Sequence, residues 1–350
     1  MIVMDLKTDN FFAFKNFHIN MSYPKKIVNS AINPEHLQDR PNFRYKKVNI
    51  ILGANATGKT TLGKILMSTF NFISCKEVVA LTNCINDNLK EANLSIDFII
   101  INDNKIYRLL VKILPERDNV YNEDNIKIKV VSASIDKRDN YEICARKLDK
   151  LIESAEYGYL EELDKVNSST DFSNGKSLSE NYLEIVLKAF DPSIKRVEKI
   201  ENSYVISLGD KKILVKDGEI VKKDLISSGT ASGIAIAEII AGNREFYYCD
   251  EKFLSVHNEV EKAILSIMIS KLSWNQQLFF TTHNTNVLDM NLPKHSFTFL
   301  KKYKVDDDYI IECVYPSDYL KRNTDSLKLA AENDLFLASP DLDELYTLLE

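Results

Sequence analysis

Short apolar or alternating runs, separated by polar turns, recur along this chain of 350 residues. Runs of this kind favour β-strands, and the turn residues Asp103 and Asn104 between two of them predict an antiparallel hairpin. Further short strands are expected around the turns Gly209-Asp210 and Asp217-Gly218. The other segments expected to form strands are residues 11–21, 48–52, 94–101, 105–114, 126–135, 245–249, 277–282, 296–301 and 309–314.

Apolar residues at helical spacing predict helices between these strands. The expected helices cover residues 62–73, 141–166, 178–190, 229–241 and 256–272, and the tail from residue 318 is mostly helical. Ser177 and Glu180 form a capping-box pattern before the third helix, which ends at Asp191-Pro192. Gly242 is the expected end of the fourth helix, and the polar residues 167–177 are the expected linker.

This order of elements predicts an α/β fold with a mixed, largely parallel core sheet. We expect the core to be discontinuous, with one part in residues 1–75 and the other in residues 178–315. Residues 76–177 are expected to form an inserted lobe with an antiparallel β subdomain and a helical part, and residues 316–350 a helical tail.

Composition narrows the class of protein. The five cysteines form no C-x-x-C pair, which argues against a disulfide framework or a zinc site. No run of about 18 apolar residues is present, and the N-terminus does not resemble a secretion signal, so a cytoplasmic protein is expected. The net charge of −6 argues against broad nucleic-acid binding, although it leaves a local basic patch possible.

A glycine-rich turn stands between the expected strand 48–52 and the expected helix 62–73. Its sequence GANATGKT matches the pattern G-x-x-x-x-G-K-[ST] and is followed by Thr61. In this pattern backbone N–H groups surround phosphates, the lysine reaches the β- and γ-phosphates, and the hydroxyl after it binds Mg²⁺. The residues expected to bind the nucleotide here are Gly53, Asn55, Ala56, Thr57, Gly58, Lys59, Thr60 and Thr61.

Polar residues also follow two later apolar strands. Asp250 and Glu251 come at the end of residues 245–249, and His283 follows residues 277–282. Because ligands gather at the carboxyl ends of strands in α/β sheets, all three are expected to lie near the phosphate loop. Asp250 is then expected to hold Mg²⁺ together with Thr60, Glu251 to act as the general base, and His283 to sense the γ-phosphate.

Ser227, Ser228 and Gly229 stand immediately before the expected helix 229–241. They can serve simply as the cap of a buried helix. They can also present the N-terminus of that helix to the γ-phosphate of a nucleotide held by a second subunit, with Ser227 and Gly229 making the contact.

Taken together, these motifs resemble the ABC-type ATPase head of SMC proteins, of the recombination mediator RecF and of the overcoming-lysogenization-defect (OLD) family. The chain is most similar to the OLD-like AAA-15 and AAA-21 ATPases, many of which serve in bacterial anti-phage systems. The resemblance runs from about residue 11 to about residue 302, except for the insertion. It rests on the Walker A match GANATGKTT, the segment FDPSIKRVE, the signature-like SSGT, the Walker B match YYCDE, the D-loop-like LSVHNEVEKAI with His257, and the switch-histidine match TTHNTNVLD.

The sequence departs from the family pattern in several places. Its only glutamines are Gln38, Gln276 and Gln277, so no Q-loop glutamine lies between the Walker A motif and the signature. Ser228 replaces the second glycine of the signature. No long coiled coil separates the halves, and the residues after the switch strand are too few for a Toprim nuclease domain.

The resemblance implies an ATPase that uses ATP and Mg²⁺, with Lys59, Glu251 and His283 as catalytic residues, and closes as a homodimer or higher homo-oligomer around nucleotide. It also implies a sensor or scaffold that controls a separate effector, a nuclease or toxin, in anti-phage defence. The insertion and the tail are then either partner surfaces or peripheral packing. The alternatives are a RecF-like DNA-repair ATPase, with basic residues near 40–47 and 195–199 on phosphates, and a module that binds ATP without hydrolysing it.

Overall fold

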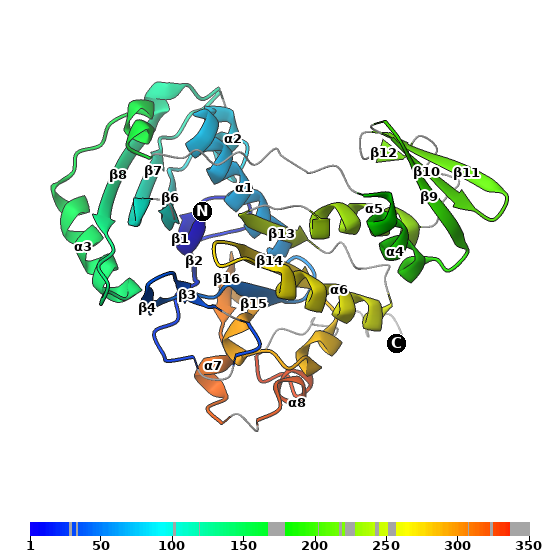
Figure 1. The fold of residues 1–350 in the computed structure, drawn as a ribbon. Helices are drawn as coiled ribbons and strands as arrows, with labels where there is room; N and C mark the ends of the chain where they lie inside the picture. The colour runs from blue at the N-terminus through cyan, green and yellow to red at the C-terminus, as the bar shows by residue number, and fades with distance from the viewer. Residues whose placement is uncertain are drawn as a thin grey trace, which may run out of the picture.

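The fold was analysed in a computed structural model (Figure 1). The structure describes residues 1–336 apart from residues 28–29, 33, 101–102, 119, 167–178, 202, 217–218, 221–227, 242–244, 251–256, 307 and 323–324. The predicted linker at 167–177, Ser177 and the helix stop Gly242 lie outside the described residues.

The core sheet has the strand order β13-β14-β5-β15-β16. Its strands are β5 (Val48–Leu52), β13 (Phe246–Asp250), β14 (Gln277–Thr282), β15 (Phe297–Val305) and β16 (Asp308–Val314). All neighbours pair in parallel except β15 and β16, which are antiparallel. Every residue of β5 and β14 is buried, as expected for central strands covered on both faces. The predicted mixed, largely parallel sheet is therefore confirmed.

Helices cover both faces of this sheet. One face packs on α1 (Lys59–Cys75), where Ile51 and Phe279 join one apolar cluster with Leu62 and Leu66. The opposite face packs on α6 (Asn258–Lys271) and on residues of α5 (Ser228–Ala241) in a second cluster. The helices predicted at 62–73, 229–241 and 256–272 are thus confirmed, with α1 starting inside the glycine-rich motif.

A second sheet is antiparallel and has the order β2-β1-β6-β7-β8. Its strands are β1 (Ile2–Asp9), β2 (Phe17–Asn20), β6 (Ala92–Ile100), β7 (Lys105–Ile113) and β8 (Ile126–Ser134). The hairpin of β6 and β7 was predicted. Because β1 pairs with β6, the predicted boundary at residue 75 does not separate two sheets, and the inserted strands extend a sheet that the N-terminus begins.

The strand predicted over residues 11–21 is wrong for most of its length. Only Phe17–Asn20 form a strand, whereas Asn10, Phe12 and Asn16 have positive φ angles of 63°, 47° and 49°. Left-handed backbone interrupts a strand, so the segment turns here and its apolar residues Phe11 and Phe14 pack into the core. The true first strand, β1, was not predicted.

A lobe with α4 (Glu180–Phe190), α5 and the antiparallel order β12-β11-β10-β9 lies to one side of the core sheet (Figure 1). Its strands are β9 (Ile194–Ile200), β10 (Ser203–Leu208), β11 (Lys211–Lys216) and β12 (Glu219–Ile220). The predicted capping box is corrected, since α4 is capped by Ser179, whose side chain accepts a hydrogen bond from the Tyr182 N–H. Glu180 is the first residue of the helix rather than its third residue, which a capping box with Ser177 would require.

Apart from α3, the remaining elements are short. They are β3 (His36–Leu37), β4 (Arg40–Arg44), α2 (Val78–Thr82), α3 (Tyr141–Ser154), α7 (Pro316–Tyr319), α8 (Leu327–Glu332) and the 3₁₀ helices η2 (Glu123–Asn125), η3 (Leu160–Lys165), η5 (Thr285–Asp289) and η6 (Lys294–Ser296). The helix predicted over 141–166 is therefore split into α3 and η3. None of the helices in the described part of the chain combines the length and the apolar character that crossing a bilayer requires.

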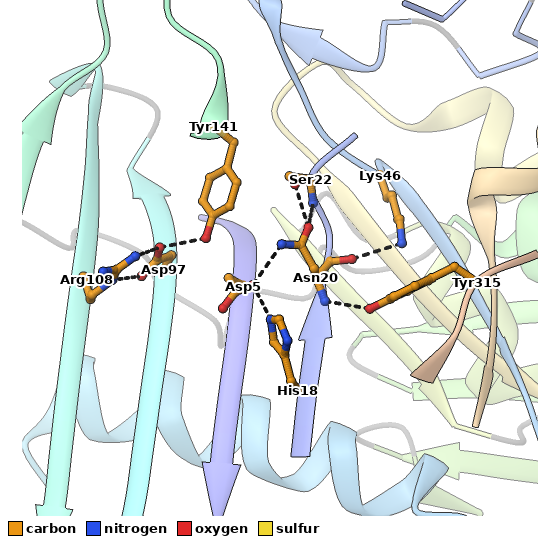
Figure 2. Close-up of polar contacts among 9 residues, drawn as sticks. All are labelled: Asp5, His18, Asn20, Ser22, Lys46, Asp97, Arg108, Tyr141 and Tyr315. Carbon is orange, nitrogen blue, oxygen red and sulfur yellow. Dashed lines mark hydrogen bonds and ion pairs between the residues drawn. The ribbon is translucent and has the colours of Figure 1, made fainter. Parts of the chain in front are cut away.

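Two sets of polar contacts lie in the antiparallel sheet and beside the core sheet (Figure 2). In the first set, between β6 and β7, the Arg108 guanidinium donates to both carboxylate oxygens of Asp97, at 2.6 and 2.7 Å. In the second set, nearer the core sheet, Asn20 donates to Asp5, and the Asn20 carbonyl accepts from the Lys46 ammonium at 3.0 Å. Lys46 precedes β5 closely, so the second set joins β1 and β2 to the strand that leads to the glycine-rich loop.

Candidate active site

Strand order brings the predicted site residues to one edge of the core sheet. Asp250 at the end of β13 is in register with Thr281, and Thr282 at the end of β14 is in register with Leu52 at the end of β5. The residues that follow these strand ends are Gly53, at the start of the loop, and His283. Glu251 follows Asp250 in sequence but lies outside the described residues.

The glycine-rich loop is bent back on itself between β5 and α1. Gly58 immediately before α1 has φ 93°, and Ala56 has φ 61°. A Cβ on Gly53 would lie 2.6 Å from Thr57 Oγ1 and 2.7 Å from the Leu300 carbonyl oxygen. Both glycines are thus required by the path of the backbone, as the phosphate-loop pattern predicts.

The Lys59 ammonium lies within the curve of this loop. It donates to the carbonyl oxygens of Gly53 and Ala54, both at 2.9 Å, and the side chain of Thr57 also donates to Ala54 at 2.9 Å. Lys59 is only 4% exposed, whereas Asn55, Ala56 and Thr60 are exposed and Thr61 is half-buried. The loop therefore presents its outer residues to solvent around a buried cation.

His283 reaches the same point from β14. Its Nδ1 is 3.5 Å from the Lys59 Nζ, across 224 positions of sequence. Anions are the ligands that a buried ammonium and a neighbouring imidazole attract together. The structure therefore brings Lys59 and His283 together, and their contact with the terminal phosphate of a nucleotide stays a prediction.

Asp250 and Thr60 line one cavity of about 360 Å³, whose wall also contains Lys64, Met67 and Ile239. The Asp250 Oδ1 accepts a hydrogen bond from the Thr281 hydroxyl at 2.8 Å, which orients the carboxylate. A hydroxyl and a carboxylate are the oxygen donors that Mg²⁺ takes while it keeps several waters. The two residues expected to bind the metal therefore fit it in chemistry, and they line the same cavity.

Tyr248 ties the two halves of this site together, which the sequence did not reveal. It lies on β13 two residues before Asp250, and its hydroxyl donates to the Lys59 carbonyl oxygen at 2.5 Å. Its ring packs against Phe279 of the neighbouring strand β14. The first turn of α1 is thereby fixed to the strand that carries Asp250.

Glu261 and Asn284 also lie at the site, and the sequence motifs did not predict a role for either. Glu261 accepts hydrogen bonds from Thr282 and Asn284, the two neighbours of His283. A signal was present in the sequence, because Glu261 falls on the same helical face as Ile264, Leu265 and Met268. An acid on a buried face needs partners, and here it has them.

The signature-like segment is described only in part. Ser227 lies outside the described residues, and Gly229 is half-buried near the start of α5. The buried Thr230 donates to Asp191 at 3.5 Å, which holds the first turn of α5 against the end of α4. The N-terminus of α5 therefore belongs to the lobe of β9–β12.

Gln276 and Gln277 have structural roles at the start of β14. Gln277 is fully buried, accepts from the Val3 N–H at 2.9 Å, and donates to the carbonyl oxygens of Val3 and Lys46, both at 3.1 Å. It thus fastens β1 to the core sheet. Gln276 caps the turn before β14 by accepting from the Ser273 N–H.

Comparisons with known proteins bear on the fold. No protein-family model matches the sequence, and no curated protein matches it. A crystal structure of the SMC head bound to the C-winged helix domain of ScpA matches with a TM-score of 0.50 and 13% identity, covering 91% of this chain and 100% of that chain. The SMC head domain from Thermotoga maritima matches with a TM-score of 0.41 and 12% identity, covering 90% and 99%. The first likeness shows that the chain has the fold of an SMC head, the ABC-type P-loop ATPase fold, as predicted.

Proposed function

We propose that the protein binds ATP with Mg²⁺ in the glycine-rich loop and hydrolyses it between two copies of the chain. The observation that carries this proposal is the convergence of Lys59 and His283, 3.5 Å apart, inside a loop bent around the Lys59 ammonium. Asp250 ends a neighbouring strand at the same edge of the sheet. Phosphoryl transfer in P-loop ATPases uses a lysine on the β- and γ-phosphates and a carboxylate that holds Mg²⁺, and an imidazole can add a hydrogen bond to the γ-phosphate.

Each residue has a definite task in this reaction. The Lys59 ammonium, now satisfied by two loop carbonyls, turns outward to the β- and γ-phosphates, and the loop N–H groups surround them. Thr60 and Asp250 hold Mg²⁺, which neutralises charge on the phosphates when bound. Glu251 orients and deprotonates the attacking water, and His283 donates a hydrogen bond to the γ-phosphate.

The second copy completes the site. The N-terminus of α5, with Ser227 and Gly229, faces the γ-phosphate of the partner's nucleotide and contributes the positive end of a helix dipole. Support comes from the place of this N-terminus in the β9–β12 lobe and from the signature-like sequence. Neither copy alone then holds every group that the reaction needs.

The biological role that we propose is a scaffold that controls a separate effector, a nuclease or toxin, in bacterial anti-phage defence. The motif resemblance to OLD-like ATPases supports it. So does the C-terminal region, because Lys328 on α8 donates to Asp289 at 2.8 Å and to Asn286 at 3.3 Å, both on η5, which begins two residues after His283. A protein that engages the tail can thereby influence the segment that carries His283.

Two measurements on the purified protein test the ATPase proposal. ATP binding with Mg²⁺ is followed by calorimetry, and phosphate release by a coupled assay, each with and without duplex DNA. We expect binding and release without DNA. Binding without release would leave a nucleotide-dependent assembly module, and a protein that binds no ATP would overturn the proposal.

A further inference from the structure

Glu261 is a buried carboxylate that lies next to the site, and the sequence motifs assign it no function. It lies in the first turns of α6 and is only 2% exposed. An ionised carboxylate in such a position is costly unless hydrogen bonds compensate for the lost water. Its hydrogen-bond partners therefore indicate what the Glu261 carboxylate does.

Both oxygens of this carboxylate point to the residues on either side of His283. The Thr282 hydroxyl donates to Oε1 at 2.7 Å, and the Asn284 side-chain amide donates to Oε2 at 2.6 Å. Hydrogen bonds to a charged acceptor are the strong ones, and two of them fix orientation as well as distance. The backbone before and after His283 is thus held by one side chain.

The two donors are themselves locked by short-range bonds. The Asn284 N–H donates to the Thr282 hydroxyl at 3.0 Å, and the Asn286 N–H donates to the Asn284 side-chain oxygen at 3.0 Å, which starts η5. The loop Thr282-His283-Asn284 therefore has little freedom as long as the carboxylate of Glu261 is in place. Its position sets where the imidazole lies relative to Lys59.

We infer that Glu261 is a positioning residue for hydrolysis, which holds His283 at the place where it contacts the γ-phosphate. This inference rests on the proposed ATPase function. One carboxylate thereby fixes the segment on both sides of His283 to the first turn of α6.

A hydrogen-bond swap tests the inference. In Glu261→Gln, the amide keeps an acceptor for Thr282 but turns a donor toward the donor of Asn284, so the loop loses one anchor. Adding Asn284→Asp restores an acceptor for the new amide and still accepts from the Asn286 N–H. The double variant Glu261→Gln/Asn284→Asp therefore regains both anchors with the carboxylate moved to the other side.

We expect Glu261→Gln to lower kcat by about 10- to 100-fold, since small misplacements of a catalytic group have effects of that size. The dissociation constant for ATP should change little, because the phosphate loop is untouched. The double variant should recover most of the lost kcat. Glu259→Gln is the matched control, because Glu259 is exposed on the same helix and its carboxylate forms an ion pair with the Lys262 ammonium.

A second readout is independent of turnover. Histidine ring signals in the NMR spectrum are assigned with His283→Asn, and the signal of His283 is compared among the variants. It should be sharp in the wild type, broadened in Glu261→Gln and sharp again in the double variant, while the signals of His18, His36 and His295 stay unchanged.

These readouts separate the possible failures. A wild type that releases no phosphate defeats the ATPase proposal, yet the NMR comparison still decides whether Glu261 fixes the His283 loop. A His283 signal that is the same in Glu261→Gln as in the wild type overturns the inference. So does a kcat that falls only in proportion to the folded fraction, or one that the double variant fails to recover.

Discussion

The core sheet and the antiparallel sheet use polar side chains in opposite ways. In the core sheet, β5 and β14 are buried throughout, and the site residues come at the strand ends. In the antiparallel sheet, charged residues lie within the strands, as Asp97 on β6 and Arg108 on β7 do. The first arrangement leaves a sequence motif after β5, β13 and β14, whereas the second leaves no local pattern.

The buried pair of the antiparallel sheet is held together from several sides. Burial raises the pKa of the Asp97 carboxyl, and the Arg108 guanidinium and the Tyr141 hydroxyl oppose that rise. Tyr141 donates to Asp97 at 2.8 Å from α3 (Figure 2). The pair thus joins β6, β7 and α3, and its loss should affect stability rather than nucleotide binding.

The largest effect is expected from Arg108→Met. It leaves the carboxylate of Asp97, which is 2% exposed, without its cation, and such a loss typically costs about 3–5 kcal/mol of unfolding free energy. Urea unfolding measures the change. The double variant Asp97→Asn/Arg108→Met should recover most of it, because no buried charge remains. A loss of ATP affinity in the folded single variant would contradict the separation of the two regions.

Lys59→Ala should have the reverse effect. The protein should keep its stability but lose ATP binding, and its turnover should fall by about 10²–10³-fold, as the loss of one aligned group does. Calorimetry and phosphate release measure the two losses. Lys76→Ala, at the exposed C-terminal end of the same helix, is the control and should behave as the wild type.

Gly53→Ala should weaken nucleotide binding through the backbone. Its new Cβ meets the Leu300 carbonyl oxygen at 2.7 Å, so the loop must shift, and overpacking of this kind costs about 1–3 kcal/mol. ATP affinity should fall accordingly. The comparison variant is Gly209→Asn, at φ 58° in a turn with no atom near the added Cβ. Equal ATP affinity in Gly53→Ala and the wild type would show that the loop path is not required.

The smallest effect concerns the junction between the sheets. Burial lowers the pKa of Lys46 from 10.5 to about 8, so the folded state binds fewer protons than the unfolded state above pH 8. The free energy of unfolding should therefore rise with pH from 8 to 10, by at most about 1.4 kcal/mol per pH unit from this group. Above pH 10 the buried tyrosines Tyr45 and Tyr315, whose pKa values burial raises, oppose the trend.

Unfolding curves of Lys46→Met at several pH values check this assignment. Part of the rise in unfolding free energy between pH 8 and 10 should disappear in this variant. The other part should remain, because burial also lowers the pKa of Lys47 to about 8. The exposed Lys25→Met should leave the rise unchanged. A rise of the same size in Lys46→Met and the wild type would show that Lys46 does not titrate in this window.

The sequence predicted those parts of the fold that local patterns determine. The strand 48–52, the loop after it and α1 followed from an apolar run, a glycine motif and helical spacing. β1 was missed because Asp5 and Lys7 interrupt its apolar residues, and Asp5 finds its partners His18 and Asn20 on β2, far from any local signal.

The same limit applies to the site. Gly53, Lys59, Asp250 and His283 were predicted because they stand in recurrent motifs after strands. The parts that hold them in place depend on contacts over long sequence distances, such as the bond from Tyr248 to the Lys59 carbonyl. Only the placement of the chain in space reveals such partners.

The pairing of two copies around nucleotide is tested most directly by light scattering on the variant Glu251→Gln with saturating ATP and Mg²⁺. We predict a mass of two chains, or a multiple of it, that falls to one chain when ATP is withheld or when Lys59→Ala is added. Single copies of Glu251→Gln with the nucleotide bound would contradict the proposed shared site.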